Sequence, residues 1–199
     1  PQPLLSKEGS LNLAVPFTSQ APNGNWAQPY QDACEEASVF MVHEFYAGNT
    51  LSAIDSTTAD KNILDLVALE NKTFGYFADT TVAETAQVAE AMYGYCKSEI
   101  IENPTIDQIK DHLNRGEPVI VPAAGRMLNN PYFTQPGPPY HMIVIRGYTK
   151  DKKFIVNDPG TKHGKEYLYS FDTVMNAMHD WNKNVDITQG RKAILILHP

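Results

Sequence analysis

The sequence lacks any long apolar run and any concentration of positive charge. No stretch of about eighteen apolar residues occurs, so we expect no membrane-spanning helix. No stripe of Lys and Arg is present, and the formal net charge is −7. Because binding to phosphates requires clustered positive side chains, we expect no nucleic-acid partner.

Cysteine is also scarce, with only Cys34 and Cys96 in 199 residues. Two cysteines do not make a disulfide framework, and each has a separate interpretation. Cys96 follows Tyr95 among apolar neighbours, and we interpret it as a small buried hydrophobe. Cys34 is the candidate reactive thiol.

Internal repeats and low-complexity segments are absent as well. The hydrophobic fraction of 42% is ordinary for a globular protein, and the length suits one domain with two lobes. The chain starts at Pro1 with neither an initiator Met nor a signal-peptide pattern. We therefore expect a processed or trimmed form of a monomeric protein located outside the cytoplasm or secreted.

Hydrophobic spacing changes period along the chain. Helical spacing dominates the first half, and short apolar runs dominate the second half. The predicted helices cover residues 34–46, 58–70, 82–93, 105–116 and 171–181. The predicted extended segments cover residues 11–17, 98–101, 118–122, 140–148, 154–158, 165–169 and 193–197. This segregation predicts an α+β fold with an antiparallel sheet, a helical lobe over about residues 18–116 and a β lobe over about 117–199.

Cys34 lies at the predicted start of the first helix. Asp32 is a good N-cap residue, and Glu35 stands three positions later, at the spacing of a capping box. With this cap Cys34 becomes the second helical residue, where free backbone N–H groups and the helix dipole favour a thiolate. The pattern predicts that Cys34 is a catalytic nucleophile.

A nucleophilic cysteine needs a base, and the base needs a group that orients it. Of six histidines, His141 alone opens a strongly apolar strand after a proline-rich loop, where it can face a cleft. Asp158 ends the following strand. If the hairpin turns near Asp151, a bulge of one or two residues brings His141 and Asp158 within diagonal reach. Asp158 before Pro-Gly is equally typical of a turn.

An acyl-transfer site also needs a donor for the oxyanion. Gln20 lies upstream of Cys34, and its side-chain amide could act together with the Cys34 backbone N–H. An upstream glutamine is by itself a weak signal, because most such residues are ordinary surface side chains.

Four segments together resemble a known family: 15–20 (Val-Pro-Phe-Thr-Ser-Gln), Cys34, 141–148 (His-Met-Ile-Val-Ile-Arg-Gly-Tyr) and 157–159 (Asn-Asp-Pro). They are similar to the papain-fold cysteine peptidases related to bacteriocin-processing (double-glycine) peptidases, in particular to their stand-alone branch. The likeness covers about residues 13–181. It implies a papain-like fold with a helical lobe, a β lobe and a cleft between them.

The resemblance implies a role for each matching residue. Cys34 attacks a peptide carbonyl, His141 moves the proton, Asp158 orients His141, and Gln20 binds the oxyanion. The resemblance also implies that the substrates are peptides or proteins and that the protein needs no cofactor and no metal. The fused membrane and ATP-hydrolysing domains of the export enzymes have no counterpart here, so cleavage of leader peptides is not carried over.

Two departures from the family pattern bear on the chemistry. Glu35 and Glu36 follow the nucleophile where Gly-Pro is frequent, and two nearby carboxylates raise the pKa of the Cys34 thiol. The segment from Gln20 to Cys34 is longer than in papain and contains Trp26 and Tyr30. This insertion either lines the cleft or removes Gln20 from the site.

Alternatives remain open at this point. The same residues could serve an amidase or an acyltransferase. A catalytically silent module could bind a peptide or glycan through the aromatic residues near the cleft, namely Trp26, Tyr30, Tyr132, Phe133 and Tyr140. We name Trp26 and Tyr140 as the substrate-binding candidates. A zinc site of Cys34, His141 and Asp158 is the weakest alternative, because no close-spaced ligand pair is present.

Overall fold

The computed structural model describes residues 9–95, 97–183 and 186–199. The expectations for the start at Pro1 and for Cys96 lie outside these residues. In chain order the elements are β1 (Leu11–Asn12), η1 (Tyr30–Asp32), α1 (Cys34–Tyr46), α2 (Ser56–Phe74), α3 (Val82–Tyr93), β2 (Lys97–Glu102), α4 (Ile106–Asn114), β3 (Val119–Ala124), η2 (Gly125–Leu128), β4 (Tyr140–Tyr148), β5 (Lys153–Asn157), β6 (Tyr167–Ser170), α5 (Phe171–Ala177), η3 (Ile187–Gln189) and β7 (Ala193–His198).

One antiparallel sheet organises the molecule. Its strands follow the order β2-β7-β3-β4-β5-β6, and β1 pairs with β4. All nine residues of β4 are buried, as expected for an apolar strand covered on both faces. The mixed helical and antiparallel architecture confirms the predicted α+β fold.

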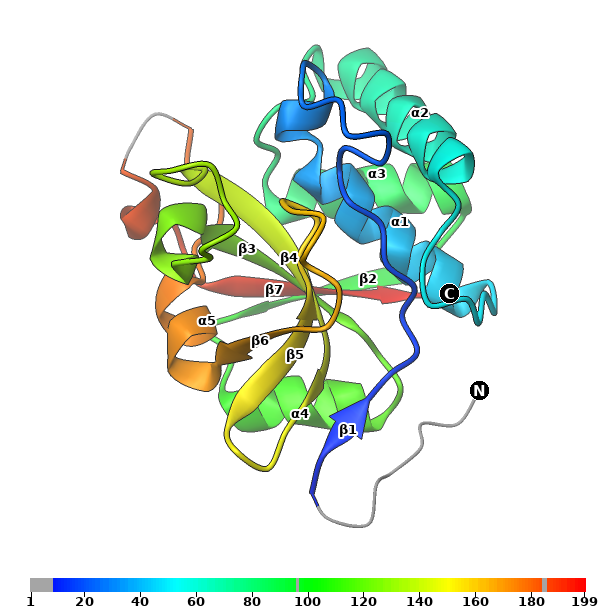
Figure 1. Ribbon diagram of the computed structural model, residues 1–199. Helices are drawn as coiled ribbons and strands as arrows, with labels where there is room; N and C mark the ends of the chain where they lie inside the picture. Colours follow the sequence, from blue (N-terminus) through cyan, green and yellow to red (C-terminus); the bar gives the residue numbers. More distant parts are fainter. Residues whose placement is uncertain (1–8, 96, 184–185) are drawn as a thin grey trace.

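The helices divide between two places around the sheet. Figure 1 shows α1, α2 and α3 grouped together on one side, with α4 and α5 away from that group. α1 packs on β4, whereas α4 packs on β3 and β4. The predicted lobe boundary near residue 116 therefore differs from the structure, because β2 and α4 (residues 97–114) lie with the sheet.

Local sequence explains most helix ends. The capping boxes of Thr81 with Glu84 and of Thr105 with Gln108 are both formed. The helix predicted over 58–70 begins earlier, because the Asp55 side chain accepts hydrogen bonds from the first N–H groups of α2. The helix predicted over 171–181 is shorter. It stops at Ala177, where the chain returns to the sheet to form a bridge and a backbone hydrogen bond with β3.

The N-terminal extended segment is held mainly by side chains. Only Leu11–Asn12 forms a strand within the predicted range 11–17. The carbonyl oxygen of Val15 then accepts hydrogen bonds from Arg146 (2.7 Å) and from the Asn157 amide (3.1 Å). These bonds fix the path of the chain toward Gln20. Among the described residues, no helix has the length and apolar character needed to cross a membrane.

Candidate active site

The start of α1 differs from the prediction. Its N-cap is Ala33, which makes no side-chain capping bond, and Cys34 is the first helical residue. Asp32 belongs to the preceding turn η1 and accepts a hydrogen bond from Gln28. The predicted capping box is wrong because the Glu35 side chain turns into the protein instead of back to the cap.

The Cys34 thiol is buried beside a carboxylate. Its Sγ donates to Oε2 of Glu35 at 3.0 Å, and the residue is 5% exposed. Burial raises the pKa of the Cys34 thiol well above its usual value, and the negative charge of Glu35 raises it further. These two effects outweigh the helix N-terminus that was expected to favour the thiolate.

His141 and Asp158 meet across β4 and β5. Val144 pairs with Asn157, and extending this register by one residue places Asp158 opposite position 143. His141 lies two residues further along the same face, which is the diagonal position. A bulge at Arg146 shifts the register, as the sequence predicted. As a result His141 Nε2 lies 2.8 Å from Asp158 Oδ1, with both side chains buried.

Asp158 is surrounded by hydrogen-bond donors. Besides His141, its Oδ1 accepts the backbone N–H of Gly160 at 3.0 Å. Its Oδ2 accepts Tyr169 OH at 2.6 Å and Asn130 Nδ2 at 3.0 Å. Burial would raise the pKa of Asp158, but the charge of His141 and these hydrogen bonds lower it below its usual value. Asp158 is therefore held as a carboxylate.

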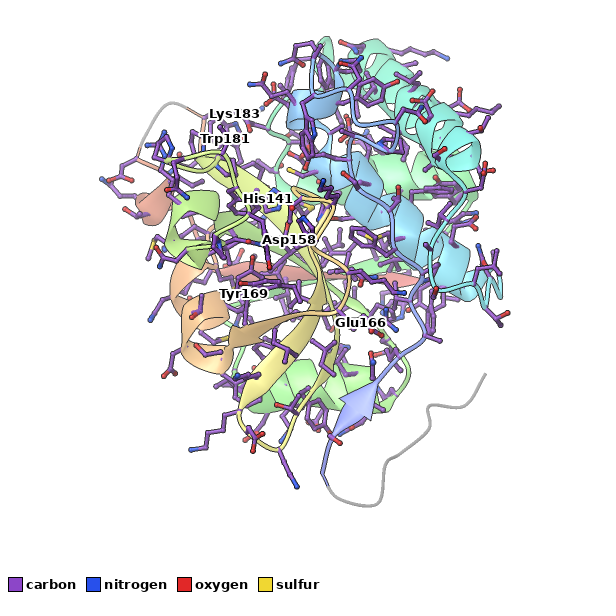
Figure 2. The ribbon with its side chains drawn as sticks, in the orientation of Figure 1. His141, Asp158, Glu166, Tyr169, Trp181 and Lys183 are labelled. Atoms are coloured by element: carbon purple, nitrogen blue, oxygen red, sulfur yellow. The ribbon has the colours of Figure 1, made fainter. Side chains whose placement is uncertain are left out.

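This carboxylate determines the state of the imidazole. An ionised Asp158 can only accept, so Nε2 of His141 carries a proton and Nδ1 is the nitrogen that can take one. Gly160 allows the close packing around the ring, because a Cβ at this position would lie 2.8 Å from Cε1 of His141. In Figure 2 Asp158 lies between His141 and Tyr169.

A contact between α1 and β4 brings the nucleophile candidate to the histidine. Ser38 Oγ donates to the carbonyl oxygen of Met142 at 3.3 Å. Ser38 stands one helical turn after Cys34 on the same face, and Met142 directly follows His141. The first turn of α1 is thereby placed over the His141 end of β4. Among the described residues, however, the thiol makes its hydrogen bond to Glu35 and none to the His141 ring.

Gln20 is present at the site but already engaged. It is 4% exposed, and its backbone N–H donates to the carbonyl oxygen of Pro159, next to Asp158. Its Nε2 donates to the carbonyl oxygens of Tyr30 and Gln31, both at 2.9 Å. Both amide hydrogens are therefore used to hold the turn that precedes α1.

The two substrate-binding candidates have different surroundings. Trp26 is 42% exposed and lines a cleft of about 870 Å³. Tyr140 is 3% exposed, and its OH donates to the carbonyl oxygen of Thr80 at 2.9 Å. Contrary to the expectation, Tyr140 offers no surface to a substrate in this structure, because its side chain points away from the cleft into the helical layer.

The cleft runs between the N-terminal segments and the loops that follow β3 and β5. Its lining comes from residues 17–26 and 53–56 on one side and from residues 131–134 and 160–163 on the other. Tyr132 is 52% exposed and stacks near His163, with ring centroids 4.5 Å apart. Gly160 belongs both to the cleft lining and to the surroundings of the His141 ring, so one residue separates the cleft from that ring.

A second pair of carboxyl groups lies behind Cys34. Glu36 and Glu70 are each 1% exposed, and no described donor reaches either oxygen of Glu36 or Oε2 of Glu70. Burial raises the pKa of Glu36 well above its usual value, and it raises that of Glu70 to about 7. When one of the groups is protonated, a hydrogen bond between them can satisfy one oxygen of each.

Sequence reasoning missed two partners of the site, Tyr169 and Asn130, which donate to Asp158. The effect of Glu35 on the pKa of Cys34 was predicted, but its direct hydrogen bond to the thiol was not. Asn130 and Tyr169 come from a loop and a strand far apart in sequence, and no local pattern points to a shared acceptor. Among residues 9–95, 97–183 and 186–199, no group of three or more His, Cys, Asp or Glu side chains could hold a metal ion.

The fold, with a buried cysteine at the start of α1 and a buried His–Asp pair on the sheet, is that of a cysteine peptidase-like protein. The chain belongs to the Peptidase_C39 like family, whose pattern matches residues 12–188. No curated protein matches the chain.

One solved structure agrees with this fold, and two others give lower scores. A Bacillus anthracis protein described as a C39-like peptidase superposes with a TM-score of 0.60 at 17% identity, covering 96% of this chain and 99% of its own. At this identity the likeness shows the fold alone. Interpain A, a cysteine protease of Prevotella intermedia, gives 0.45 at 18% identity, with 87% of this chain and 64% of its own covered. A prointerpain A fragment from the same organism gives 0.46 at 17% identity, with 86% and 48% covered.

Proposed function

We propose that this protein is a cysteine peptidase that hydrolyses peptide bonds. The observation that carries the proposal is the buried pair of His141 and Asp158, 2.8 Å apart, at the end of β4 that α1 covers with its first turn. The sole cysteine of that turn is Cys34. A nucleophile, a base and an orienting carboxylate in this chain order fit the family to which the chain belongs.

The reaction begins with proton transfer from the Cys34 thiol to Nδ1 of His141. The thiolate then forms a bond to the peptide carbonyl carbon, and the carbonyl π electrons move to the oxygen. His141 returns the proton to the amine as the C–N bond breaks, which leaves an acyl group on sulfur. Water, deprotonated by His141, releases the acid and restores the thiol. Asp158 keeps the ring oriented and stabilises its charged form.

Two donors can stabilise the oxyanion. As the first residue of α1, Cys34 has a backbone N–H without an acceptor inside the helix. Gln20 supplies the second donor only if one of its bonds to Tyr30 or Gln31 is exchanged for the oxyanion. Its contribution therefore depends on movement of the turn before α1.

The cleft is the proposed binding site for the substrate polypeptide. It is long enough to be lined by four separate segments, and Trp26 and Tyr132 offer exposed aromatic faces on its two sides. Aromatic rings of this kind bury large apolar area with little loss of rotamer freedom. We propose that a substrate chain lies in this cleft with its scissile bond at the His141 ring.

The test is a comparison of Cys34→Ala with Cys96→Ala on a library of fluorogenic peptides and amides. Cys96 is the only other cysteine, so it provides a matched control for loss of a thiol. We expect Cys34→Ala to abolish hydrolysis and Cys96→Ala to retain it. Activity that survives in Cys34→Ala would overturn the proposal. Selective hydrolysis of simple amides, or acyl transfer to added amines, would reassign the same residues to an amidase or an acyltransferase.

A silent peptide-binding module is the second candidate function. The observation that favours it is the thiol itself, which is buried, bonded to Glu35 and shifted to a higher pKa. In that case both variants would show no hydrolysis and equal peptide binding, measured by calorimetry on the peptides of the same library. Trp26→Ala would weaken that binding without any change in the thiol.

A further inference from the structure

A continuous set of hydrogen bonds connects β4 to the Cys34 thiol. Tyr140 OH donates to the carbonyl oxygen of Thr80, whose own N–H donates to Oε1 of Glu35, each at 2.9 Å. The thiol of Cys34 donates to the other oxygen, Oε2 of Glu35, at 3.0 Å. All four residues are buried. The Glu35 carboxyl group is therefore fixed at both oxygens and cannot swing away as a surface side chain would.

Acidic side chains predominate around the thiol. The groups that act most strongly on it are Glu35, Glu36 and Asp79, from α1 and from the segment before α3. Glu70 of α2 acts on the thiol through Glu35. β4 contributes Tyr140 and His141, and His141 is the one basic side chain in this set. A thiolate at Cys34 would thus form next to several carboxyl groups, which disfavours its charge.

The His141 imidazole does not offset the effect of these acidic groups on the thiol in this structure. Nε2 of His141 is bonded to Asp158, and no hydrogen bond joins the ring to the thiol in the part of the chain that the structure describes. A thiolate–imidazolium pair would offset the acidic surroundings, but it requires that contact. The arrangement has a base bonded to Asp158 and a candidate nucleophile whose hydrogen bond goes to Glu35.

We propose that Glu35 is a positioning residue that holds the Cys34 thiol protonated at rest, so that the sulfur must turn from Glu35 to His141 before it can attack. This inference rests on the proposed function. The proton stays on sulfur while Glu35 accepts the hydrogen bond. After the turn it passes to Nδ1 of His141, which gives a thiolate and an imidazolium, and Glu35 keeps its own protonation state.

The test measures the rate of iodoacetamide alkylation of Cys34 from pH 5 to 10, in a Cys96→Ala background where it is the only thiol. We expect the wild-type Cys34 to titrate above the value of about 8.5 of an unstructured cysteine. Glu35→Gln replaces an ionisable carboxyl group by a neutral amide of nearly the same shape. It should lower the titration midpoint by at least one unit and speed alkylation at pH 7 about tenfold, since each unit of pKa changes the thiolate fraction tenfold.

Glu36→Gln is the matched control, because it makes the same chemical change at the next residue, whose carboxyl group has no bond to the thiol. It should shift the midpoint by less than half of the Glu35→Gln shift. His141→Ala should change resting alkylation less than threefold in the parent protein. In the Glu35→Gln variant, His141→Ala should remove most of the increase in the alkylation rate. This is expected because the thiol released from Glu35 reacts faster only when it can pair with His141.

The outcomes separate this proposal from the proposed function. A wild-type Cys34 that alkylates rapidly at pH 6, or a Glu35→Gln variant that is unchanged or slower, would overturn the role of Glu35 even if Cys34→Ala abolishes hydrolysis. If Glu35→Gln fails to fold, the wild-type profile and its small response to His141→Ala still decide the question. Hydrolysis that survives in Cys34→Ala would overturn the peptidase and leave the alkylation result standing.

Discussion

Two buried carboxyl groups of the same site, Asp158 and Glu35, have opposite environments. Asp158 accepts four hydrogen bonds from a histidine, a tyrosine, an asparagine and a backbone N–H, and its pKa falls below the usual value. Glu35 accepts one backbone N–H and one thiol, faces other carboxyl groups, and its burial raises its pKa well above the usual value. Burial is common to both, so the donors and neighbouring charges decide the ionisation.

The contrast separates two sides of the site, the sheet with His141 and Asp158 and helix α1 with Cys34 and Glu35. On the sheet, Asp158 accepts the hydrogen bond of His141 Nε2 and so leaves Nδ1 as the nitrogen that can take a proton. On α1, burial and the acidic side chains raise the pKa of the Cys34 thiol. In the proposed mechanism the base is therefore ready before substrate binds and the nucleophile is restrained, so substitutions on the two sides should have effects of opposite sign on thiol reactivity.

The largest effect is expected from breaking the sheet side at Asp158. Asp158→Asn replaces the acceptor for Nε2 of His141 by an amide that can donate to it, which favours the wrong tautomer. We expect kcat to fall by about 10³–10⁴-fold, as for the equivalent change in a Ser-His-Asp triad. Steady-state kinetics on a peptide substrate measure this loss. A loss below tenfold in a protein that melts normally would contradict the assignment of Asp158.

A smaller effect is expected when Asp158 loses one donor. Tyr169→Phe removes the 2.6 Å hydrogen bond to Oδ2 while the ring stays in place. Hydrogen bonds to charged groups contribute about 1.5–3 kcal/mol, so we expect kcat/KM to fall about tenfold or more. The pKa of Asp158 should rise, and activity should therefore be lost at a higher pH on the acid side of the pH–rate profile.

Tyr167→Phe is the control for this prediction. Tyr167 lies two residues away in β6, and its ring packs against that of Tyr169. It makes no hydrogen bond to Asp158 in the described part of the chain. An equal loss of activity in both variants would show that packing of β6, and not the bond to Asp158, is responsible.

The smallest effect concerns stability on the acidic side of the site. Burial raises the pKa of Glu70 to about 7, above the ordinary value of 4.5. A carboxyl group with a raised folded-state pKa stabilises the fold below its unfolded pKa, and this contribution is lost as pH rises toward 7. We expect the loss to be about 3 kcal/mol between pH 4.5 and 8, since each unit of pKa shift corresponds to about 1.4 kcal/mol.

Glu70→Gln should remove this pH dependence, so that the variant gains stability relative to the wild type at pH 8 more than at pH 5. Urea denaturation at the two pH values measures the difference. Glu102→Gln is the control. Glu102 is an exposed residue of the edge strand β2 and does not belong to the buried acidic group around Glu70. A Glu70→Gln variant with an unchanged pH dependence would contradict the raised pKa.

Prediction from the sequence worked best where the pattern is local. Residues 34–46 and 140–148 form the expected helix and strand because apolar spacing matches one secondary-structure period throughout. The pairing of His141 with Asp158 was predicted as well, since a two-stranded hairpin with one bulge limits the partners to few choices. The roles of Cys34, His141, Asp158 and Gln20 in catalysis stay predictions.

What the sequence determined by itself was most of the helices and strands, the antiparallel character of the sheet and the His141–Asp158 hairpin, because each depends on neighbours close along the chain. The order of the strands was left to the tertiary structure. Only the tertiary structure decided which donors surround each carboxyl group. Glu35 has the spacing of a helix cap, yet Thr80 and Cys34 bind it inside the protein. Tyr140 likewise turns inward. Burial and charge depend on segments far apart in sequence, and no local pattern records which of them meet.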